Sequence, residues 1–162
     1  MIKEAAIFAA GCFWGIQYYF DQVPGVIESQ VGYIGGKTKN PSYEQVCSGQ
    51  TGHAEAVKIV FDPKTISYQT LLRHFFRVHN PTQMNRQGPD VGTQYRSAIF
   101  YLDSEQQNQA KQTIDSLNKE QFGGKVVIAL EKASYFWPAA KYHQKFTERT
   151  GRGMCHVEYA PI

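Results

Sequence analysis

Apolar residues occur along the chain in short runs, some with the continuous or alternating pattern of strands and others with the spacing of about 3.6 residues typical of helices. Runs rich in small, branched or aromatic residues predict strands at residues 2–10, 26–34, 55–61, 97–102 and 126–130. Helical spacing and start signals predict helices at residues 12–20, around 43–47, from 68 to near 80, from 104 to near 122, and from Pro138 onward. Strands and helices therefore alternate.

Glycine and capping residues mark the ends of several elements. Gly11 ends the first strand directly before a helix, which puts Cys12 at a strand-to-helix junction. Asn40 is expected to cap the short helix that follows it. Ser104 with Gln107 has the spacing of a capping box for a later helix.

The chain is expected to form one domain. It has 162 residues, enough for one buried core, and shows no internal repeat, linker or low-complexity stretch. We predict an α+β fold over residues 1–162, a two-layer α/β sandwich of the ferredoxin-like α-β plait type with a mixed or antiparallel sheet. Residues 147–162 are expected to form a flexible, glycine-rich C-terminal tail.

The charge pattern argues against nucleic-acid and membrane partners. The net charge is +3, and Lys and Arg are spread along the chain rather than gathered into a run that could follow phosphates. No stretch approaches the roughly 18 consecutive apolar residues of a membrane-spanning helix. The apolar run at residues 5–10 is too short for an export signal, and Glu4 cancels the charge of Lys3. We expect a cytoplasmic protein.

Three cysteines, an odd number, argue against a disulfide framework and for at least one free thiol. In the first turn of a helix, Cys12 would meet backbone N–H groups and a helix dipole that favour the thiolate. Cys12 is therefore a candidate nucleophile. Its position alone is equally compatible with a small buried apolar side chain.

Neither a bound metal nor a bound organic cofactor is expected. The three cysteines and five histidines lack paired short spacings of the Cys-x-x-Cys type. The segment Gly32-Tyr33-Ile34-Gly35-Gly36 lacks the G-x-G-x-x-G spacing of a dinucleotide site and is interpreted as a turn. Electrons for a redox reaction would then come from thiols.

Four short motifs together span nearly the whole chain. They are Gly11-Cys12-Phe13-Trp14-Gly15, Gly52-His53-Ala54-Glu55-Ala56, Gly92-Thr93-Gln94-Tyr95-Arg96-Ser97 and Tyr142-His143-Gln144. In sequence and in order, they resemble the motifs of the A-type peptide methionine sulfoxide reductases.

The resemblance implies an enzyme that reduces methionine sulfoxide, with Cys12 as the nucleophile. A sulfoxide becomes electrophilic at sulfur when its oxygen is protonated or strongly hydrogen-bonded. The family's acid matches Glu55, which needs apolar surroundings to stay protonated near neutral pH. Without the motif, Glu55 would be interpreted as a solvated strand residue. The two family tyrosines that bind the sulfoxide oxygen match Tyr43 and Tyr95.

Three more residues match the family's substrate-binding positions. Phe13 and Trp14 would form the apolar wall that receives the methyl group of the substrate. Asp90 matches the acidic residue that holds the substrate's backbone amide. Ordinary core packing for Phe13 and Trp14, and an exposed loop position for Asp90, are the structural alternatives.

The reaction leaves a sulfenic acid on Cys12, which a second thiol can convert to a disulfide. The resemblance implies that Cys155 is this resolving cysteine. Because the chain has no further distal cysteine, it also implies that thioredoxin reduces the Cys12–Cys155 disulfide directly. A spectator thiol is the alternative for Cys155. Cys47 is interpreted as structural or incidental.

The resemblance further implies substrates: the S epimer of methionine sulfoxide in oxidised proteins, in peptides and as the free amino acid. A monomer is expected. A thiol peroxidase or redox sensor is one rival, although it has no use for Glu55 as an acid. A non-catalytic module that binds methionine in an aromatic pocket is the other, and it has no use for Cys155.

Overall fold

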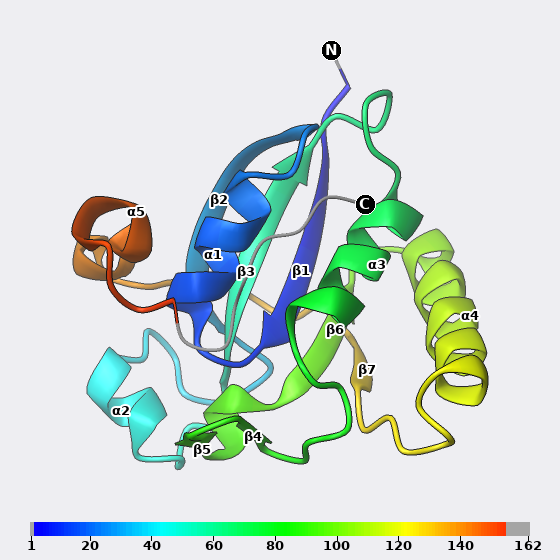
Figure 1. The fold of residues 1–162 in the computed structure, drawn as a ribbon. Coiled ribbons are helices and arrows are strands. Elements are labelled where there is room, and N and C mark those ends of the chain that lie inside the picture. The colour runs from blue at the N-terminus through cyan, green and yellow to red at the C-terminus, as the bar shows by residue number, and fades with distance from the viewer. Residues whose placement is uncertain (1, 155–162) are drawn as a thin grey trace.

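The computed structural model describes residues 2–154 of the chain (Figure 1). Short 3-10 turns are labelled η. The elements, in chain order, are β1 (Glu4–Ala10), α1 (Phe13–Asp21), β2 (Val26–Ile34), α2 (Tyr43–Cys47), β3 (Ala54–Phe61), α3 (Tyr68–Val78), β4 (Arg86–Gln87), β5 (Asp90–Val91), η1 (Thr93–Tyr95), β6 (Ser97–Tyr101), α4 (Ser104–Glu120), β7 (Ala129–Lys132), β8 (Trp137–Pro138), η2 (Lys141–His143) and α5 (Phe146–Thr150).

Six strands form one sheet in the order β7-β6-β1-β3-β2-β8. The four central strands pair with one another antiparallel. With α1 after β1 and α3 after β3, they follow the β-α-β-β-α-β order of a ferredoxin-like plait. At the edges, β7 joins β6 in parallel and β8 joins β2 antiparallel, so the sheet is mixed. The predicted α+β fold class is confirmed.

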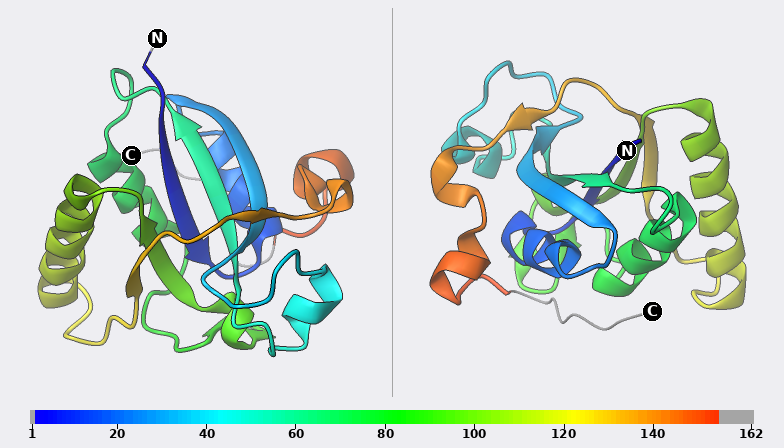
Figure 2. Two further views of the ribbon diagram at one scale, coloured as in Figure 1. Left: turned by 180° about the vertical axis from the view of Figure 1, so that it is seen from behind. Right: turned by 90° about the horizontal axis from the view of Figure 1, so that it is seen from above.

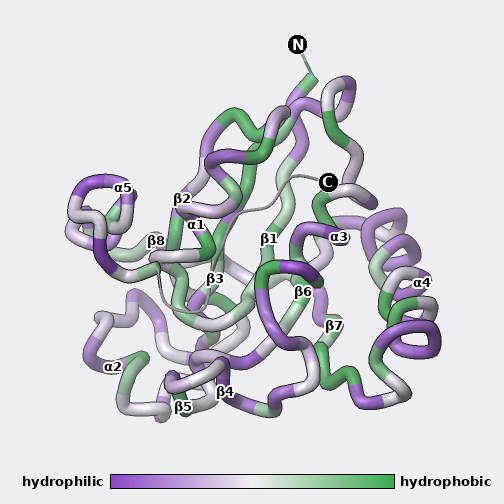
Figure 3. The backbone as a smooth tube through the Cα atoms, viewed as in Figure 1, coloured by the Kyte–Doolittle hydropathy of each residue, from purple (hydrophilic) through white to green (hydrophobic). Residues whose placement is uncertain are grey.

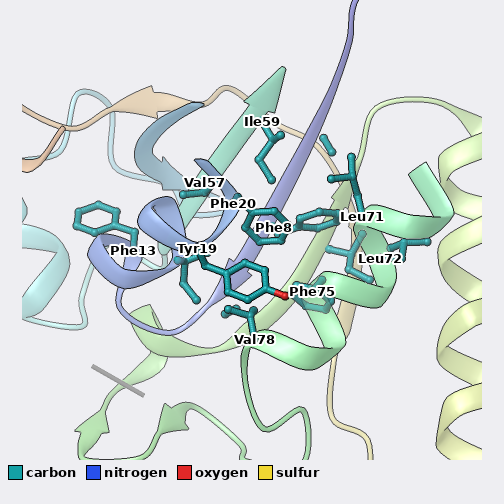
Figure 4. Close-up of a cluster of buried hydrophobic side chains, with 14 of the residues drawn as sticks. Phe8, Phe13, Tyr19, Phe20, Val57, Ile59, Leu71, Leu72, Phe75 and Val78 are labelled. Atoms are coloured by element: carbon teal, nitrogen blue, oxygen red, sulfur yellow. The ribbon is translucent and has the colours of Figure 1, made fainter. Parts of the chain in front are cut away.

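The main core lies between the sheet and the helices α1 and α3 (Figure 4). Alternation along β1 points Phe8 to this side, where its ring centroid lies 5.8 Å from that of Phe20 and 5.0 Å from that of Phe75. Leu71 and Leu72 of α3 complete this part of the core, and all five side chains are fully buried. Each contributes about 1.5–3 kcal/mol by leaving water.

The opposite face of the sheet carries a smaller core. Ile7 and Ala9 of β1 and Phe100 of β6 point to this side. The segment between β7 and β8 crosses the face and packs Ala133 and Phe136 against it (Figure 2). The crossing brings the chain to the edge of β2, from which η2 and α5 continue toward α1.

The long helix α4 packs against α3 at the side of the molecule. Most of it is hydrophilic in Figure 3. Ala110 is buried, and Ile114 and Leu117 are partly buried against the main core. These three residues share one helix face, since they are spaced three or four residues apart.

Two helix caps differ from those predicted. Ser42, not Asn40, caps α2: its hydroxyl accepts the N–H of Gln45 at 3.1 Å, and the Gln45 side chain accepts the N–H of Ser42 at 2.9 Å. The carboxylate of Asp103 caps α4, one residue before the predicted Ser104. Because several capping residues stand side by side at both places, the pattern alone did not select among them.

The predicted helix from Pro138 is wrong. Trp137–Pro138 instead forms β8 at the edge of the sheet, where a residue without an N–H is tolerated. The pairing with β2 continues one residue further, as the N–H of Ala139 donates to the carbonyl of Val31 at 3.0 Å. A long-range pairing therefore overrides the local helix signal of the proline.

Two other segments differ in extent. The strand predicted at residues 126–130 is found at Ala129–Lys132, where the parallel pairing with β6 sets its position. Regular structure also extends into the predicted tail, since residues 147–150 belong to α5. Residues 155–162 of the predicted tail lie outside the described residues.

Candidate active site

Cys12 is the N-terminal capping residue of α1. Gly11 before it has a φ of 95°, a conformation that favours glycine and lets the chain turn from β1 into the helix. Cys12 itself is 8% exposed. The N–H groups of the first helical turn and the helix dipole favour a negative charge on sulfur at this position. The junction predicted from the sequence is therefore present.

Glu55 lies in β3 and is 1% exposed. Alternation along the strand points Glu55 toward α1, whereas Ala54 and Ala56 face the opposite core. Its Oε1 accepts the backbone N–H of Phe13 at 3.2 Å. The alternative of a solvated surface carboxyl is thus wrong, and the carboxyl is hydrogen-bonded to the residue that follows Cys12.

Tyr43 and Tyr95 approach this carboxyl from two separate elements, α2 and η1. Burial raises the pKa of both phenols above their ordinary range, and the negative charge of Glu55 raises it further. Both phenols therefore keep their protons and can donate hydrogen bonds. The side chain of Gln94 links the two elements, since its Nε2 donates to the carbonyl of Cys47 at 3.5 Å.

An aromatic cluster surrounds the start of α1. The rings of Phe13 and Trp14 are each nearly parallel to that of Tyr43, with centroids 6.4 Å apart in both pairs. The His143 ring lies 4.4 Å from the Tyr43 ring. Phe13 is fully buried and Trp14 is partly exposed, so Trp14 presents part of its ring to the surface beside Cys12.

His143 is a residue of this site to which the sequence reasoning assigned no role. Its Nδ1 accepts a hydrogen bond from Nε1 of Trp14 at 3.0 Å. Burial lowers the pKa of His143, which keeps Nδ1 available as an acceptor. Gln144 holds the turn in place, because its side chain bonds both the N–H and the carbonyl of Val31, at 3.0 and 2.9 Å. The available signal was the motif Tyr142-His143-Gln144.

His53 of the second motif fixes a loop near the site. Its Nδ1 accepts the N–H of Gly36 at 3.0 Å, and its Nε2 lies 2.7 Å from the carbonyl of Thr38. With Nδ1 accepting, Nε2 carries the ring proton and donates it to that carbonyl. His53 therefore ties the loop after β2 to the start of β3, two residues before Glu55.

Asp90 lies in β5 of the short β4-β5 hairpin (Figure 1). It is partly buried, and its Oδ2 has no hydrogen-bond partner within residues 2–154. Burial is the main cause that raises the pKa of Tyr95, and the charge of Asp90 adds to it. The two side chains are therefore close enough to interact, and the unused acceptor of Asp90 fits a donor group of a ligand.

Of the other two cysteines, Cys47 is among the described residues and Cys155 is not. Cys47 is the exposed last residue of α2, and its thiol hydrogen-bonds the phenol of Tyr43. Cys155 lies outside the described residues. Met154 lies against the first turn of α1, since its carbonyl oxygen would be 2.5 Å from a Cβ placed on Gly15.

Within residues 2–154, which the structure describes, no three His, Cys, Asp or Glu side chains are grouped so that they could hold a metal ion. No helix in that part is long and apolar enough to cross a membrane. What the structure brings together is a cysteine at a helix N-terminus, a buried carboxyl and two protonated phenols, an arrangement suited to thiol-dependent chemistry.

The comparison with known proteins gives the family. Residues 4–162 match the family model described as peptide methionine sulfoxide reductase, and the chain belongs to this family. It is 48% identical over 155 residues to the peptide methionine sulfoxide reductase MsrA of Methanoculleus marisnigri. This match covers 95% of this chain and 94% of the relative.

Solved structures with this fold include Mxr1 from Saccharomyces cerevisiae. Its reduced form has a TM-score of 0.89 and 31% identity, and the match covers 97% of this chain and 92% of that one. Mxr1 has also been solved in complex with Trx2, with a TM-score of 0.63 and 21% identity over 89% of this chain and 84% of that one.

Proposed function

We propose that this chain reduces the S epimer of methionine sulfoxide to methionine, in oxidised proteins, in peptides and as the free amino acid, and so repairs oxidatively damaged proteins. Family membership supports the reaction. The observation that carries the residue roles is the hydrogen bond from the Phe13 N–H to Glu55, which sets a buried carboxyl beside Cys12. The S preference follows from the family resemblance alone.

In the first step, the Cys12 thiolate attacks the sulfoxide sulfur while Glu55 gives its proton to the oxygen. The attack forms a bond between the Cys12 sulfur and the substrate sulfur. The protonated oxygen then passes to the Cys12 sulfur while the S–O bond of the substrate and the bond between the two sulfurs break, so that methionine leaves and Cys12 becomes a sulfenic acid that carries the oxygen and that proton. The substrate sulfur gains the two electrons that the Cys12 sulfur loses. Burial of Glu55 supports its role as the acid, because burial favours the neutral carboxyl.

The other side chains bind the substrate. Tyr43 and Tyr95 donate hydrogen bonds to the sulfoxide oxygen and stabilise the charge on it. Phe13 and Trp14 form the apolar wall for the methyl group. Asp90 accepts the backbone N–H of the substrate, a role that its buried and unused Oδ2 supports.

Recycling requires a second thiol. Cys155 condenses with the Cys12 sulfenic acid, which releases water and forms the Cys12–Cys155 disulfide; thioredoxin then reduces this disulfide by exchange. The contact of Met154 with Gly15 supports the pairing, because Cys155 follows Met154 directly in the chain. The Trx2 complex of Mxr1 supports the choice of thioredoxin as reductant.

Residues 1–162 act as a single catalytic domain, and the resolving Cys155 follows α5 in the chain. Thiols supply both electrons, so the reaction calls for no bound metal or organic cofactor. We propose a monomer that works in the cytoplasm.

Single-turnover reduction of the separated S and R epimers of a blocked methionine sulfoxide tests the proposal. The expected result is turnover of the S epimer alone, with a Cys12–Cys155 disulfide found afterwards by mass spectrometry. Cys12→Ser should abolish turnover. A fully active Cys12→Ser protein, or reduction of neither epimer, would overturn the proposal.

A thiol peroxidase is the rival from the same chemistry. A peroxidase favours a cationic group beside its thiolate, whereas Glu55, Tyr43 and Tyr95 are suited to protonating and binding an oxygen. Turnover of hydrogen peroxide that exceeds turnover of the sulfoxide under the same conditions would favour the rival.

A further inference from the structure

Tyr33 is a third phenol beside Glu55, and none of the roles above includes it. In the antiparallel register of β2 and β3, Tyr33 lies directly opposite Glu55. Side chains opposite each other in such a pair start from Cβ atoms about 4.5–5.5 Å apart. The Tyr33 ring also contacts Phe13, with centroids 5.6 Å apart. Tyr33 thus lies beside both residues of the Phe13–Glu55 hydrogen bond.

The hydroxyl of Tyr33 is sealed inside the protein. The side chain is 2% exposed, and its hydroxyl has no hydrogen-bond partner in the described part of the chain. A buried polar group without a partner costs about 1–3 kcal/mol. Phenylalanine would fill the same space without this cost, so packing alone does not account for a tyrosine here.

The electrostatic surroundings of Tyr33 match those of Tyr43 and Tyr95. Burial is the main cause that raises the pKa of each of the three phenols, and the charge of Glu55 is the second. All three therefore remain neutral donors. They differ in access: Tyr43 and Tyr95 are partly exposed, whereas Tyr33 is closed off from any substrate. The Tyr33 hydroxyl can therefore act on the reaction only from inside the protein, where Glu55 lies directly opposite it.

We propose that Tyr33 is a positioning residue for the acid: its hydroxyl donates, through one enclosed water molecule, to the carboxylate that remains when Glu55 gives its proton to the sulfoxide oxygen. The inference rests on the acid role proposed for Glu55. In this step the Glu55 O–H bond breaks, its electron pair stays on the carboxylate, and the water hydrogen-bonds both side chains. Such a water satisfies the Tyr33 hydroxyl as well.

Other ionisable groups face this region and contribute to its pH dependence. They come from α1, α2, η1, η2 and the β4-β5 hairpin. The groups are Cys12, Tyr43, Glu44, Cys47, Tyr95, His143 and Asp90. A substitution of Tyr33 leaves all of them in place, so a change in the pH profile can be assigned to the Tyr33–Glu55 pair.

Loss of the hydroxyl should weaken the acid. Without the donor, the Glu55 carboxylate is less stable, so Glu55 holds its proton more tightly. The decline of kcat at high pH, which follows ionisation of the acid, should move to higher pH. The plateau of kcat should fall, because the proton is harder to transfer. KM should stay the same, since Tyr33 does not touch the substrate.

Tyr33→Phe tests the proposal, with Tyr68→Phe as the matched control. Tyr68 is another buried tyrosine whose hydroxyl has no hydrogen-bond partner among the described residues, but it packs against Phe8 and not at the site. Tyr68→Phe should be as stable as the parent or more stable, and Tyr33→Phe should fold normally because it keeps the ring. Tyr33→Phe should lower kcat about tenfold, the effect expected of one hydrogen bond to a charged group. Tyr68→Phe should leave kcat and the pH profile unchanged.

Glu55→Gln separates failure of this inference from failure of the proposed acid. If Tyr33 works through Glu55, adding Tyr33→Phe to Glu55→Gln should cause no further loss of kcat. A fully active Glu55→Gln enzyme would remove the acid role itself and the inference with it. An impaired Glu55→Gln enzyme together with a Tyr33→Phe enzyme of normal kcat, or of unshifted pH profile, would overturn the Tyr33 role alone.

Discussion

Burial and a hydrogen bond act in opposite directions on the protonation of Glu55. Burial favours the neutral carboxyl, and the N–H of Phe13 favours the carboxylate by donating to Oε1. Glu55→Gln keeps an oxygen that can accept this N–H but has no transferable proton. We expect kcat to fall about 10²–10⁴-fold, the usual contribution of a general acid, with KM nearly unchanged. Steady-state kinetics measures both, and a KM effect without a kcat effect would contradict the acid role.

His143 is expected to set the orientation of Trp14. His143→Phe keeps an aromatic ring against Tyr43 but removes the acceptor 3.0 Å from Nε1 of Trp14. We expect KM to rise several-fold, because an unsatisfied indole N–H costs about 1–3 kcal/mol and the methyl-binding wall loses its fixed position.

A double-mutant cycle with Trp14→Phe checks this coupling. Once the indole is absent, the hydrogen bond to His143 no longer exists, so adding His143→Phe should change KM little. Additive effects of the two substitutions on KM would contradict the positioning role.

The contrast between Glu55 and His143 indicates what sequence can predict at single residues. Glu55 stands in a short motif whose neighbours identify it, and its burial then supports the motif. The role of His143 depends on a bond to Trp14 across 129 positions of the chain, which no local pattern contains. Tyr33 is similar, because its position opposite Glu55 depends on strand register.

At the scale of elements, α1 and the segment Gly153–Met154 are packed closely. A Cβ on Gly15 would lie 2.5 Å from the Met154 carbonyl and 3.1 Å from that of Gly153, so Gly15→Ala must push this segment away. The helix itself should tolerate alanine, which is favoured over glycine by about 0.5–1 kcal/mol. We expect normal release of the first methionine but slower formation of the Cys12–Cys155 disulfide.

Rapid mixing with quantification of methionine and of free thiols distinguishes these steps. Cys155→Ser serves as the reference, since it should release one methionine per enzyme and form no disulfide with Cys12. If Gly15→Ala slows the first release of methionine as much as it slows disulfide formation, the segment supports the catalytic site and not only the recycling step.

Periodicity predicted most elements because each strand or helix buries one face against the core. The spacing of Leu71, Leu72 and Phe75 identified α3, and these residues are fully buried. Caps and edge strands were less predictable. Adjacent polar residues compete for a cap, as at Ser42, and β8 exists because Trp137–Pro138 finds a partner in β2.

For the whole molecule, the alternation of strands and helices was enough to predict a two-layer sandwich with helices against a mixed or antiparallel sheet. It predicted neither the strand order, nor β8, nor the exact extent of β7, because these depend on partners far away in sequence. Nor does alternation indicate polar groups within the core. His74 of α3 is 3% exposed, and its Nδ1 lies 2.7 Å from the hydroxyl of Tyr19.

This buried histidine links folding to pH. Burial is the main cause that lowers the pKa of His74 from 6.5 to about 4, with the charges of Arg77 and Arg73 adding to it. The folded state therefore holds His74 neutral where the unfolded state already binds a proton. The stability it confers is present above pH 6.5 and is lost as the pH falls from 6.5 toward 4.

Urea unfolding at pH 7.5 and pH 4.5 measures this effect. A pKa lowered to about 4 corresponds to a loss of about 2–3 kcal/mol in the free energy of unfolding between these two pH values. His74→Gln does not titrate and offers an acceptor to the Tyr19 hydroxyl, so its free energy of unfolding should fall by about 2–3 kcal/mol less over the same range. Equal losses in the two proteins would show that His74 does not control the acid sensitivity of the fold, whereas a smaller loss in His74→Gln would assign that sensitivity to one buried imidazole between α1 and α3.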